Sequence, residues 1–189
     1  MKVSIKKIDQ DTKLKEVSEL AKEIWTEHYT SLIGPAQTEY MIEKFQSAAR
    51  IKKDIGENGY SYFAVYDDVV QNVIQSAVQP VVQKPIGYLA LQPHENELFI
   101  SKLYVQKEYR NRGIATEMIR FSLIFAKEKM RLKKRNRDGP DSEKPSLRLT
   151  VNKGNLGSIA FYKKAGFEIS EETVTDIGDG YFMDDYVMT

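Results

Sequence analysis

The chain has 189 residues, a length that suits one domain with an adequate hydrophobic core. Lys and Arg number 28 against 27 Asp and Glu, so no basic excess points to a nucleic-acid partner. Cysteine is absent and histidine occurs twice, which excludes disulfides, a thiol nucleophile and a cysteine-ligated zinc site, and argues against any multi-histidine metal site.

The amino-terminal residues alternate charged with apolar side chains and contain no long apolar run. Such a pattern is neither a secretory signal peptide nor a membrane anchor, and no later run is long enough to span a bilayer. We therefore expect a soluble cytoplasmic protein with no membrane partner.

The first half of the chain alternates helical and extended patterns. An apolar stripe at helical spacing runs from Leu14 to Trp25 and ends near His28 and Tyr29, and the Gly34-Pro35 pair breaks the chain after it. Later segments rich in aromatic and β-branched residues are typical of strands. The predicted elements are a strand at residues 3–8, helices from 14 to about 29, at 36–45 and at 48–55, and antiparallel strands at 60–66 and 85–91.

Residues 69–83 form an uncharged segment between the last two of these strands. A hairpin connection needs only a few residues, so this segment is an insertion. Its valine and isoleucine content argues against a plain mobile loop. An extended hairpin, a flap over an acceptor site and a self-association surface all stay open.

Residues 97–131 are predicted to form a strand that leads into a long helix, and the chain is organised around the joint between them. The joint places Arg110, Asn111, Arg112 and Gly113 directly before the helix. The first amides of a helix have no intrahelical partner and carry the positive end of its dipole. With a glycine and two arginines beside them, these amides predict a phosphate or pyrophosphate site. An ordinary turn with solvated arginines explains the joint equally well.

The joint matches neither a P-loop nor the G-x-G-x-x-G dinucleotide motif. It resembles the Arg/Gln-x-x-Gly-x-Gly/Ala signature of the GCN5-related N-acetyltransferases (GNAT family). In this sequence the signature is carried by Arg110, Asn111, Arg112, Gly113, Ile114 and Ala115.

The second half of the chain adds a charged loop, two strands around a helix, and a final hairpin. Residues 132–145 lack an apolar face and are expected to be a solvated loop. A strand at 147–151 is followed by a helix for which Asn155 is a suitable N-cap and Gly166 a suitable left-handed C-cap. Strands at 168–175 and 181–188 follow, with a turn at 178–180.

A second GNAT signature spans this helix, Asn-x-x-Asn-x-x-Ala-x-x-Phe/Leu-Tyr-x-Lys-x-Gly-Phe. Its matching residues are Asn152, Asn155, Phe161, Tyr162, Lys164, Gly166 and Phe167, and one position departs in register, so that Ile159 and Ala160 must supply the small helix residue. With both motifs in order, the resemblance covers residues 1–189 as a single domain. It implies an α/β (α+β) fold: a mixed, mostly antiparallel twisted sheet, splayed at the cofactor site and flanked by helices. A weaker likeness is to the polyamine-acetylating branch.

The resemblance also implies acetyl-CoA as cosubstrate, with no metal. The backbone of Leu103, Tyr104 and Val105 would pair with the pantetheine, and the amides from Arg112 to Thr116 would hold the pyrophosphate. Further contacts would come from Asn152, Asn155, Ala160 and Lys164, with Asn155 on the pantetheine arm and Lys164 near the nucleotide phosphate.

The implied reaction is direct attack of a neutral amine on the thioester. An amide near Leu103 would stabilise the negative charge that grows on the carbonyl oxygen. Tyr162 would donate a proton to the departing thiolate. Some members carry a glutamate base at the position of Phe99, so Glu97, His28 or ordered water would have to take the amine's proton.

The acceptor is expected opposite the cofactor, on the first helix–turn–helix and the last hairpin. Candidate residues are Glu27, His28, Tyr29, Tyr40, Asp184 and Asp185. The acceptor would be a primary amine of a small molecule, such as a polyamine, or of a peptide. A non-catalytic acyl-CoA-binding regulator on the same fold is the alternative, although Tyr162 favours the enzyme. A monomer and a homodimer both stay open.

Overall fold

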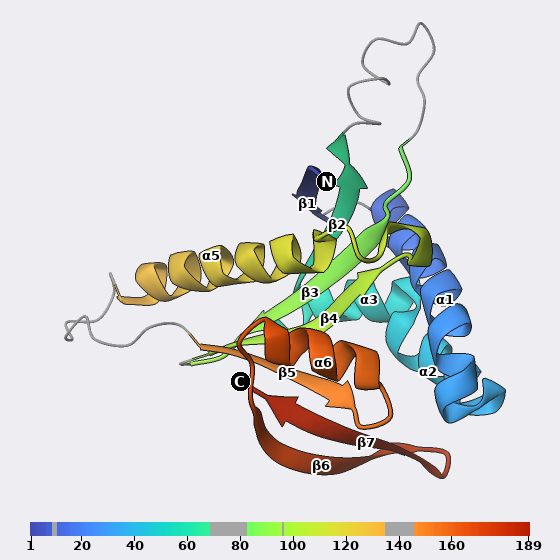
Figure 1. The fold of residues 1–189 in the computed structure, drawn as a ribbon. Coiled ribbons are helices and arrows are strands. Elements are labelled where there is room, and N and C mark those ends of the chain that lie inside the picture. Colours follow the sequence, from blue (N-terminus) through green and yellow to red (C-terminus); the bar gives the residue numbers. More distant parts are fainter. Residues whose placement is uncertain (9–10, 69–82, 96, 135–145) are drawn as a thin grey trace, which may run out of the picture. The chain divides into compact units, whose positions relative to one another are not determined.

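The structure is a computed structural model that describes residues 1–8, 11–68, 83–95, 97–134 and 146–189 (Figure 1). Most of the uncharged insertion at 69–83 and of the charged loop at 132–145 lies outside the described residues. The described chain forms two compact units. The first comprises Met1–Leu91 and Lys102–Ile119, and the second comprises Gln92–Ser101 and Arg120–Thr189.

Seven strands form one mixed sheet in the order β1-β2-β3-β4-β5-β7-β6. Their bounds are β1 Val3–Lys7, β2 Ser61–Asp67, β3 Gly87–Pro93, β4 Glu97–Val105, β5 Ser146–Asn152, β6 Ile169–Gly178 and β7 Tyr181–Met188. β1 with β2, β2 with β3, β5 with β7 and β6 with β7 are antiparallel, and β4 with β5 is parallel. The predicted mixed, mostly antiparallel sheet is confirmed.

The parallel ladder between β4 and β5 is short. It begins at Glu97 and Ser146 and ends at Ile100 and Leu149, although β4 continues to Val105. On its other edge β5 pairs with β7, from Leu149 to Asn152. The ladder therefore stops halfway along β4, which is the splay that the family resemblance implies.

The helices follow the predicted order. Their bounds are α1 Asp11–Ile33, α2 Pro35–Gln46, α3 Ala48–Gly56, α5 Ile114–Lys134 and α6 Leu156–Lys164, with a 3₁₀ turn, η1, at Lys107–Tyr109. The predicted end of the first helix near residues 28–29 is too early. α1 continues until Gly34, which has a φ of 84° and precedes Pro35 at the start of α2. Glycine tolerates this left-handed backbone, and proline suits the first position of a helix.

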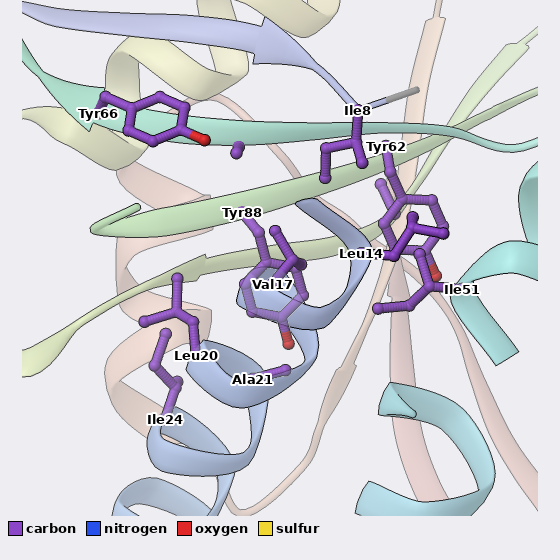
Figure 2. Packing of buried hydrophobic residues seen from close by; sticks show 12 residues of the cluster. Ile8, Leu14, Val17, Leu20, Ala21, Ile24, Ile51, Tyr62, Tyr66 and Tyr88 are labelled. Atoms are coloured by element: carbon purple, nitrogen blue, oxygen red, sulfur yellow. The ribbon is translucent and has the colours of Figure 1, made fainter. Parts of the chain in front are cut away.

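The core of the first unit lies between α1, α3 and the sheet (Figure 2). Val17, Ala21 and Ile24 lie on one face of α1, as their helical spacing requires, and are buried. Figure 2 shows this face directed towards the rings of Tyr62 and Tyr88 on the strands. The residues of this cluster are Ile8, Leu14, Val17, Leu20, Ala21, Ile24, Ile51, Tyr62, Ala64, Tyr66, Tyr88 and Ala90.

Charged groups are also buried in this unit. Asp54 on α3 is 2% exposed, and its carboxylate accepts hydrogen bonds from Arg50 Nε at 2.8 Å and from the Tyr62 hydroxyl at 3.0 Å. Lys102 on β4 is 8% exposed. Burial lowers the pKa of Lys102 to about 8, with the negative charge of Asp54 opposing that effect and Arg50 adding to it.

The second unit ends in the β6–β7 hairpin, the red ribbon of Figure 1. Gly178, Asp179 and Gly180 all have positive φ, at 88°, 58° and 77°. The turn predicted at 178–180 is thereby confirmed, since these residue types are the ones that adopt such angles readily. Among the described helices, none is long and apolar enough to cross a membrane.

Candidate functional site

The joint after β4 is a concave turn of backbone amides. Asn111 and Gly113 both have left-handed φ angles, 60° and 81°. The amide of Glu117 donates to the Gly113 carbonyl at 3.1 Å and so closes the first turn of α5. The three amides between them, those of 114–116, thus have no acceptor within the helix. A side chain added at Gly113 would meet no described atom within 4 Å, so the space above this turn is open to a ligand.

Arg110 fixes this turn to its surroundings. Its Nε donates to the Val105 carbonyl at 3.0 Å, and one Nη donates to a Glu27 carboxylate oxygen on α1 at 3.0 Å. Lys107 lies 3.3 Å from the same carboxylate. Arg112 is exposed, and its guanidinium lies 5.4 Å from the centre of the Tyr109 ring. Of the two arginines in the signature, Arg110 therefore fixes the turn through its side chain, whereas the side chain of Arg112 is exposed to solvent.

The residues predicted to pair with the pantetheine lie at the end of β4. The ring of Tyr104 stacks on that of Tyr88, with centroids 5.1 Å apart. The Tyr104 carbonyl lies against Gly87 so closely that a Cβ there would stand 2.6 Å from the oxygen. Only glycine permits this approach of β3 to β4.

The structure brings a predicted acceptor residue next to a predicted coenzyme residue. The hydroxyls of Tyr29 and Tyr104 lie 3.5 Å apart. Tyr29 also stacks on Trp25, with centroids 4.3 Å apart, and meets His28 edge-on at 4.8 Å. Trp25 Nε1 donates to the buried Tyr88 hydroxyl at 3.2 Å. These rings hold the end of α1 to the sheet, and His28, Tyr29 and Tyr104 are half-buried there.

The second signature forms the α6 helix with both predicted caps. The Asn155 side chain accepts from the Ser158 amide at 3.2 Å. At the other end Gly166 has a φ of 98°, its amide donates to Lys163 and the Phe167 amide donates to Tyr162. This is a Schellman motif, so both cap predictions are confirmed.

Tyr162 is 9% exposed and is held by its neighbours. Its ring centroid lies 5.3 Å from that of Phe161 and 5.8 Å from that of Phe167. Ala160 and Lys164 are exposed on the same helix, and Asn152 accepts from the Gly154 amide at 2.9 Å just before it. The packing role weighed for Tyr162 is therefore real, and a role for its hydroxyl stays a prediction.

Two candidate carboxylates are engaged by cations in the structure. Glu97, a candidate base, accepts from Arg148 Nε at 2.6 Å. The guanidinium of Arg148 also lies 4.6 Å from the centre of the Phe99 ring, the position where some GNAT members carry a glutamate. Glu27, a candidate acceptor residue, is bound by Arg110 and Lys107 as described above.

The remaining acceptor candidates differ in their surroundings. The Tyr40 hydroxyl accepts from Lys44 at 2.6 Å. Asp184 pairs with Lys153 at 2.6 Å. Asp185 is 8% exposed, and burial, together with the neighbouring charge of Asp184, raises its pKa to about 6.

The predicted site residues fall into two sets, each within one compact unit. The first unit holds Glu27, His28, Tyr29, Tyr40, Leu103, Tyr104, Val105 and residues 110–116. The second unit holds Glu97, Asn152, Asn155, Ala160, Tyr162, Lys164, Asp184 and Asp185. Three cations at these positions, Arg148, Lys153 and Lys102, were not among the residues predicted from the sequence. The sequence pattern could have indicated only the burial of Lys102. Side chains alternate along a strand, so Lys102 lies on the same face of β4 as Leu98, Ile100 and Tyr104.

The chain was compared with known proteins. The family model described as an acetyltransferase (GNAT) domain matches residues 58–169. A search of curated proteins found no match. The PaiA N-acetyltransferase from Thermoplasma acidophilum, solved in complex with coenzyme A, is 20% identical with a TM-score of 0.65, over 100% of this chain and 98% of that one.

Two further solved structures are similar. Arabidopsis thaliana NAA60 in complex with a bisubstrate analogue is 13% identical with a TM-score of 0.57, over 99% of this chain and 97% of that one. A spermidine N-acetyltransferase SpeG chimera from Vibrio cholerae and hSSAT is 16% identical with a TM-score of 0.59, over 100% and 94%. At such identities the structural likeness shows the shared fold.

Proposed function

Because the chain belongs to the GNAT acetyltransferase family, we propose that it transfers an acetyl group from acetyl-CoA to a primary amine by direct attack. The acceptor would be a small molecule, such as a polyamine, or a peptide amine. The observation that carries the proposal is the turn at 110–116, whose left-handed Asn111 and Gly113 leave three helix amides without intrahelical acceptors and open space above them.

These amides suit a pyrophosphate, because they present several N–H groups and the positive end of the α5 dipole to one point. Arg110 supports the binding mainly by holding the turn, since its Nε and one Nη are already engaged. Arg112 contributes charge at the rim. The backbone of 103–105 would pair with the pantetheine, with Asn155 contacting its arm and Lys164 the nucleotide phosphate.

Acetyl-CoA supplies the acyl group. As the N–C bond forms, negative charge grows on the carbonyl oxygen, and the amide near Leu103 would stabilise it. As the C–S bond breaks, the Tyr162 hydroxyl would give its proton to the sulfur. The amine must lose a proton first, because a primary amine is charged at neutral pH. Ordered water or His28 suits that step better than Glu97, which Arg148 already holds.

A binding experiment tests the coenzyme site. Gly113→Glu would place a carboxylate in the open space above the turn, where it would repel a pyrophosphate. Calorimetry should show the affinity for acetyl-CoA reduced at least about tenfold, since juxtaposed like charges cost several kcal/mol.

Gly59→Glu is the matched control. Gly59 also has a left-handed φ, 71°, and open space around it, but it lies in the turn between α3 and β2. Both variants should lose similar stability through backbone strain, and only Gly113→Glu should lose coenzyme. Equal affinities in the two variants would remove the turn from the site.

A CoA-release assay over a panel of amines then tests transfer itself. Release that depends on an amine supports the enzyme, whereas tight acetyl-CoA binding without release from any amine would favour the non-catalytic regulator. A single domain of 1–189, a cytoplasmic location and the choice between monomer and homodimer stay predictions.

A further inference from the structure

Asp185 occupies an unusual place in the second unit. It lies on β7, in register with Asn152 on β5 and with Thr173 on β6, so the three side chains share one face of the sheet. Its exposed fraction is 8%. A carboxylate this deeply buried ordinarily has hydrogen-bond donors.

The structure provides no such donor within the part of the chain that it describes. No hydrogen bond or ion pair there reaches the Asp185 side chain, whereas the adjacent Asp184 pairs with Lys153 at 2.6 Å. Among the described residues, no fully shielded side-chain oxygen lacks a partner. The Asp185 oxygens therefore keep some solvent-accessible surface.

The charges around Asp185 favour a cation. Its carboxyl, with a pKa raised to about 6, is mostly ionised at pH 7. The negative charge of Asp184 raises the pKa of Asp185, and the positive charge of Lys153 lowers it. Glu171 lies on the neighbouring strand, β6. From residue 165 to the end the chain has no Lys or Arg and seven carboxylates, those of Glu168, Glu171, Glu172, Asp176, Asp179, Asp184 and Asp185.

We propose that the Asp185 carboxylate binds the non-reacting ammonium group of an acceptor that carries two amines. This inference rests on the proposed function. The reacting amine must give up its proton before it attacks, since only the neutral amine is a nucleophile, so it loses its charge-assisted contact with a carboxylate at that point. A buried carboxylate without a donor among the described residues suits an ammonium that stays charged throughout, and two charge-assisted hydrogen bonds would satisfy it.

The test compares 1,4-diaminobutane with n-butylamine, which lacks the second ammonium. In the CoA-release assay, Asp185→Asn should raise the KM for 1,4-diaminobutane at least tenfold and leave the KM for n-butylamine within threefold. The control is Asp179→Asn, which removes one charge from the same hairpin at an exposed turn where asparagine accepts the positive φ. It should leave both KM values within threefold.

The same subsite can be measured without transfer. Calorimetry of 1,4-diaminobutane with the wild-type chain, in the absence of acetyl-CoA, should show affinity falling as the pH falls through about 6, where Asp185 gains its proton. The charges of Asp184 and Lys153 act on Asp185, and Glu171 lies on the neighbouring strand, so the Asp185→Asn variant must lose this pH dependence for the assignment to hold.

Three results would overturn the inference. The first is an unchanged KM for 1,4-diaminobutane in Asp185→Asn, and the second is that the wild-type chain does not bind 1,4-diaminobutane. The third is an equal fall in kcat for both amines in Asp185→Asn, which would make Asp185 a proton acceptor. A chain that binds 1,4-diaminobutane through Asp185 but releases no CoA would instead refute the proposed function and leave this subsite standing.

Discussion

At the scale of the single residue, Tyr162 combines a structural and a proposed chemical role. Its carbonyl accepts the amides of Ala165 and Phe167 in the C-cap of α6, and its ring lies between two phenylalanines. The structural role uses the backbone and the ring. The hydroxyl is the only part that the proposed proton transfer requires, so removing it alone separates chemistry from packing.

We expect Tyr162→Phe to lower kcat roughly 100-fold or more, the usual contribution of a positioned general acid. The affinity for acetyl-CoA and the melting temperature should change little, because the interaction strengthens in the transition state. Single-turnover kinetics with a good acceptor measure the chemical step. Phe161→Leu, which alters the neighbouring ring and keeps the hydroxyl, is the control, and wild-type turnover in Tyr162→Phe would leave Tyr162 a packing residue.

At the scale of the element, the start of α6 joins folding to coenzyme binding. Asn155 is 7% exposed and caps the helix through its side-chain oxygen, which accepts the Ser158 amide. The side-chain NH₂ is not used by that cap. The two halves of one amide can thus serve the helix and the pantetheine at once.

Asn155→Asp should preserve the cap, because a carboxylate accepts the same amide and suits the helix dipole. It removes the NH₂ donor, so the affinity for acetyl-CoA should fall roughly tenfold, the value of one lost hydrogen bond. Asn155→Ala should lose affinity and also about 1 kcal/mol of stability. Thermal melts and calorimetry measure the two effects.

Ser47→Ala supplies the comparison for the stability loss. Ser47 caps α3 through the Arg50 amide and lies outside both signatures. It should cost a similar amount of stability and leave acetyl-CoA binding unchanged. Full affinity in Asn155→Asp would remove the pantetheine contact from the proposal.

The elements themselves were predictable where local chemistry sets them. Gly34 with Pro35, Asn155 and Gly166 each act within a few residues of the chain, and each prediction holds. The predicted end of the first helix near residues 28–29 is too early because the apolar stripe stops at Trp25, although no helix-breaking residue occurs before Gly34. The length of α1 is set instead by Gly34.

At the scale of the whole molecule, the features that could not be predicted are the ion pairs between residues far apart in the sequence. Arg110 meets Glu27 across 83 residues of sequence, and Arg148 meets Glu97 across 51. Local patterns locate a turn or a cap, but they do not say which carboxylate will neutralise which cation. The signature therefore locates the turn before α5, whereas the surroundings of the acceptor candidates depend on contacts between distant parts of the chain.

Lys102 gives the molecule a stability that depends on pH. Its pKa is about 8 in the folded chain and 10.5 when exposed, so the unfolded chain binds more protons between these values. Stability should therefore rise as the pH goes from 8 to 10.5, by up to about 3 kcal/mol at about 1.4 kcal/mol per pKa unit. Lys102→Met should abolish this rise and stabilise the chain at pH 7.

Denaturant unfolding between pH 7 and 10 measures the effect. Asp54 keeps Arg50 and Tyr62 as partners in Lys102→Met, so its own charge stays compensated. Lys52→Met, at an exposed site, should leave the rise intact. A wild-type curve that is flat across this range would show that Lys102 is not buried as a cation.

The sheet order ends at β6, so one side of this strand has no strand neighbour among the described elements. Val174 and Phe182 are 65% and 54% exposed on the same hairpin, a combination that ordinarily invites a second copy to extend the sheet. The carboxylates of Glu171, Glu172 and Asp176 line that strand. Two such edges brought together would repel each other, so this row of carboxylates opposes edge-to-edge pairing of two copies of the chain.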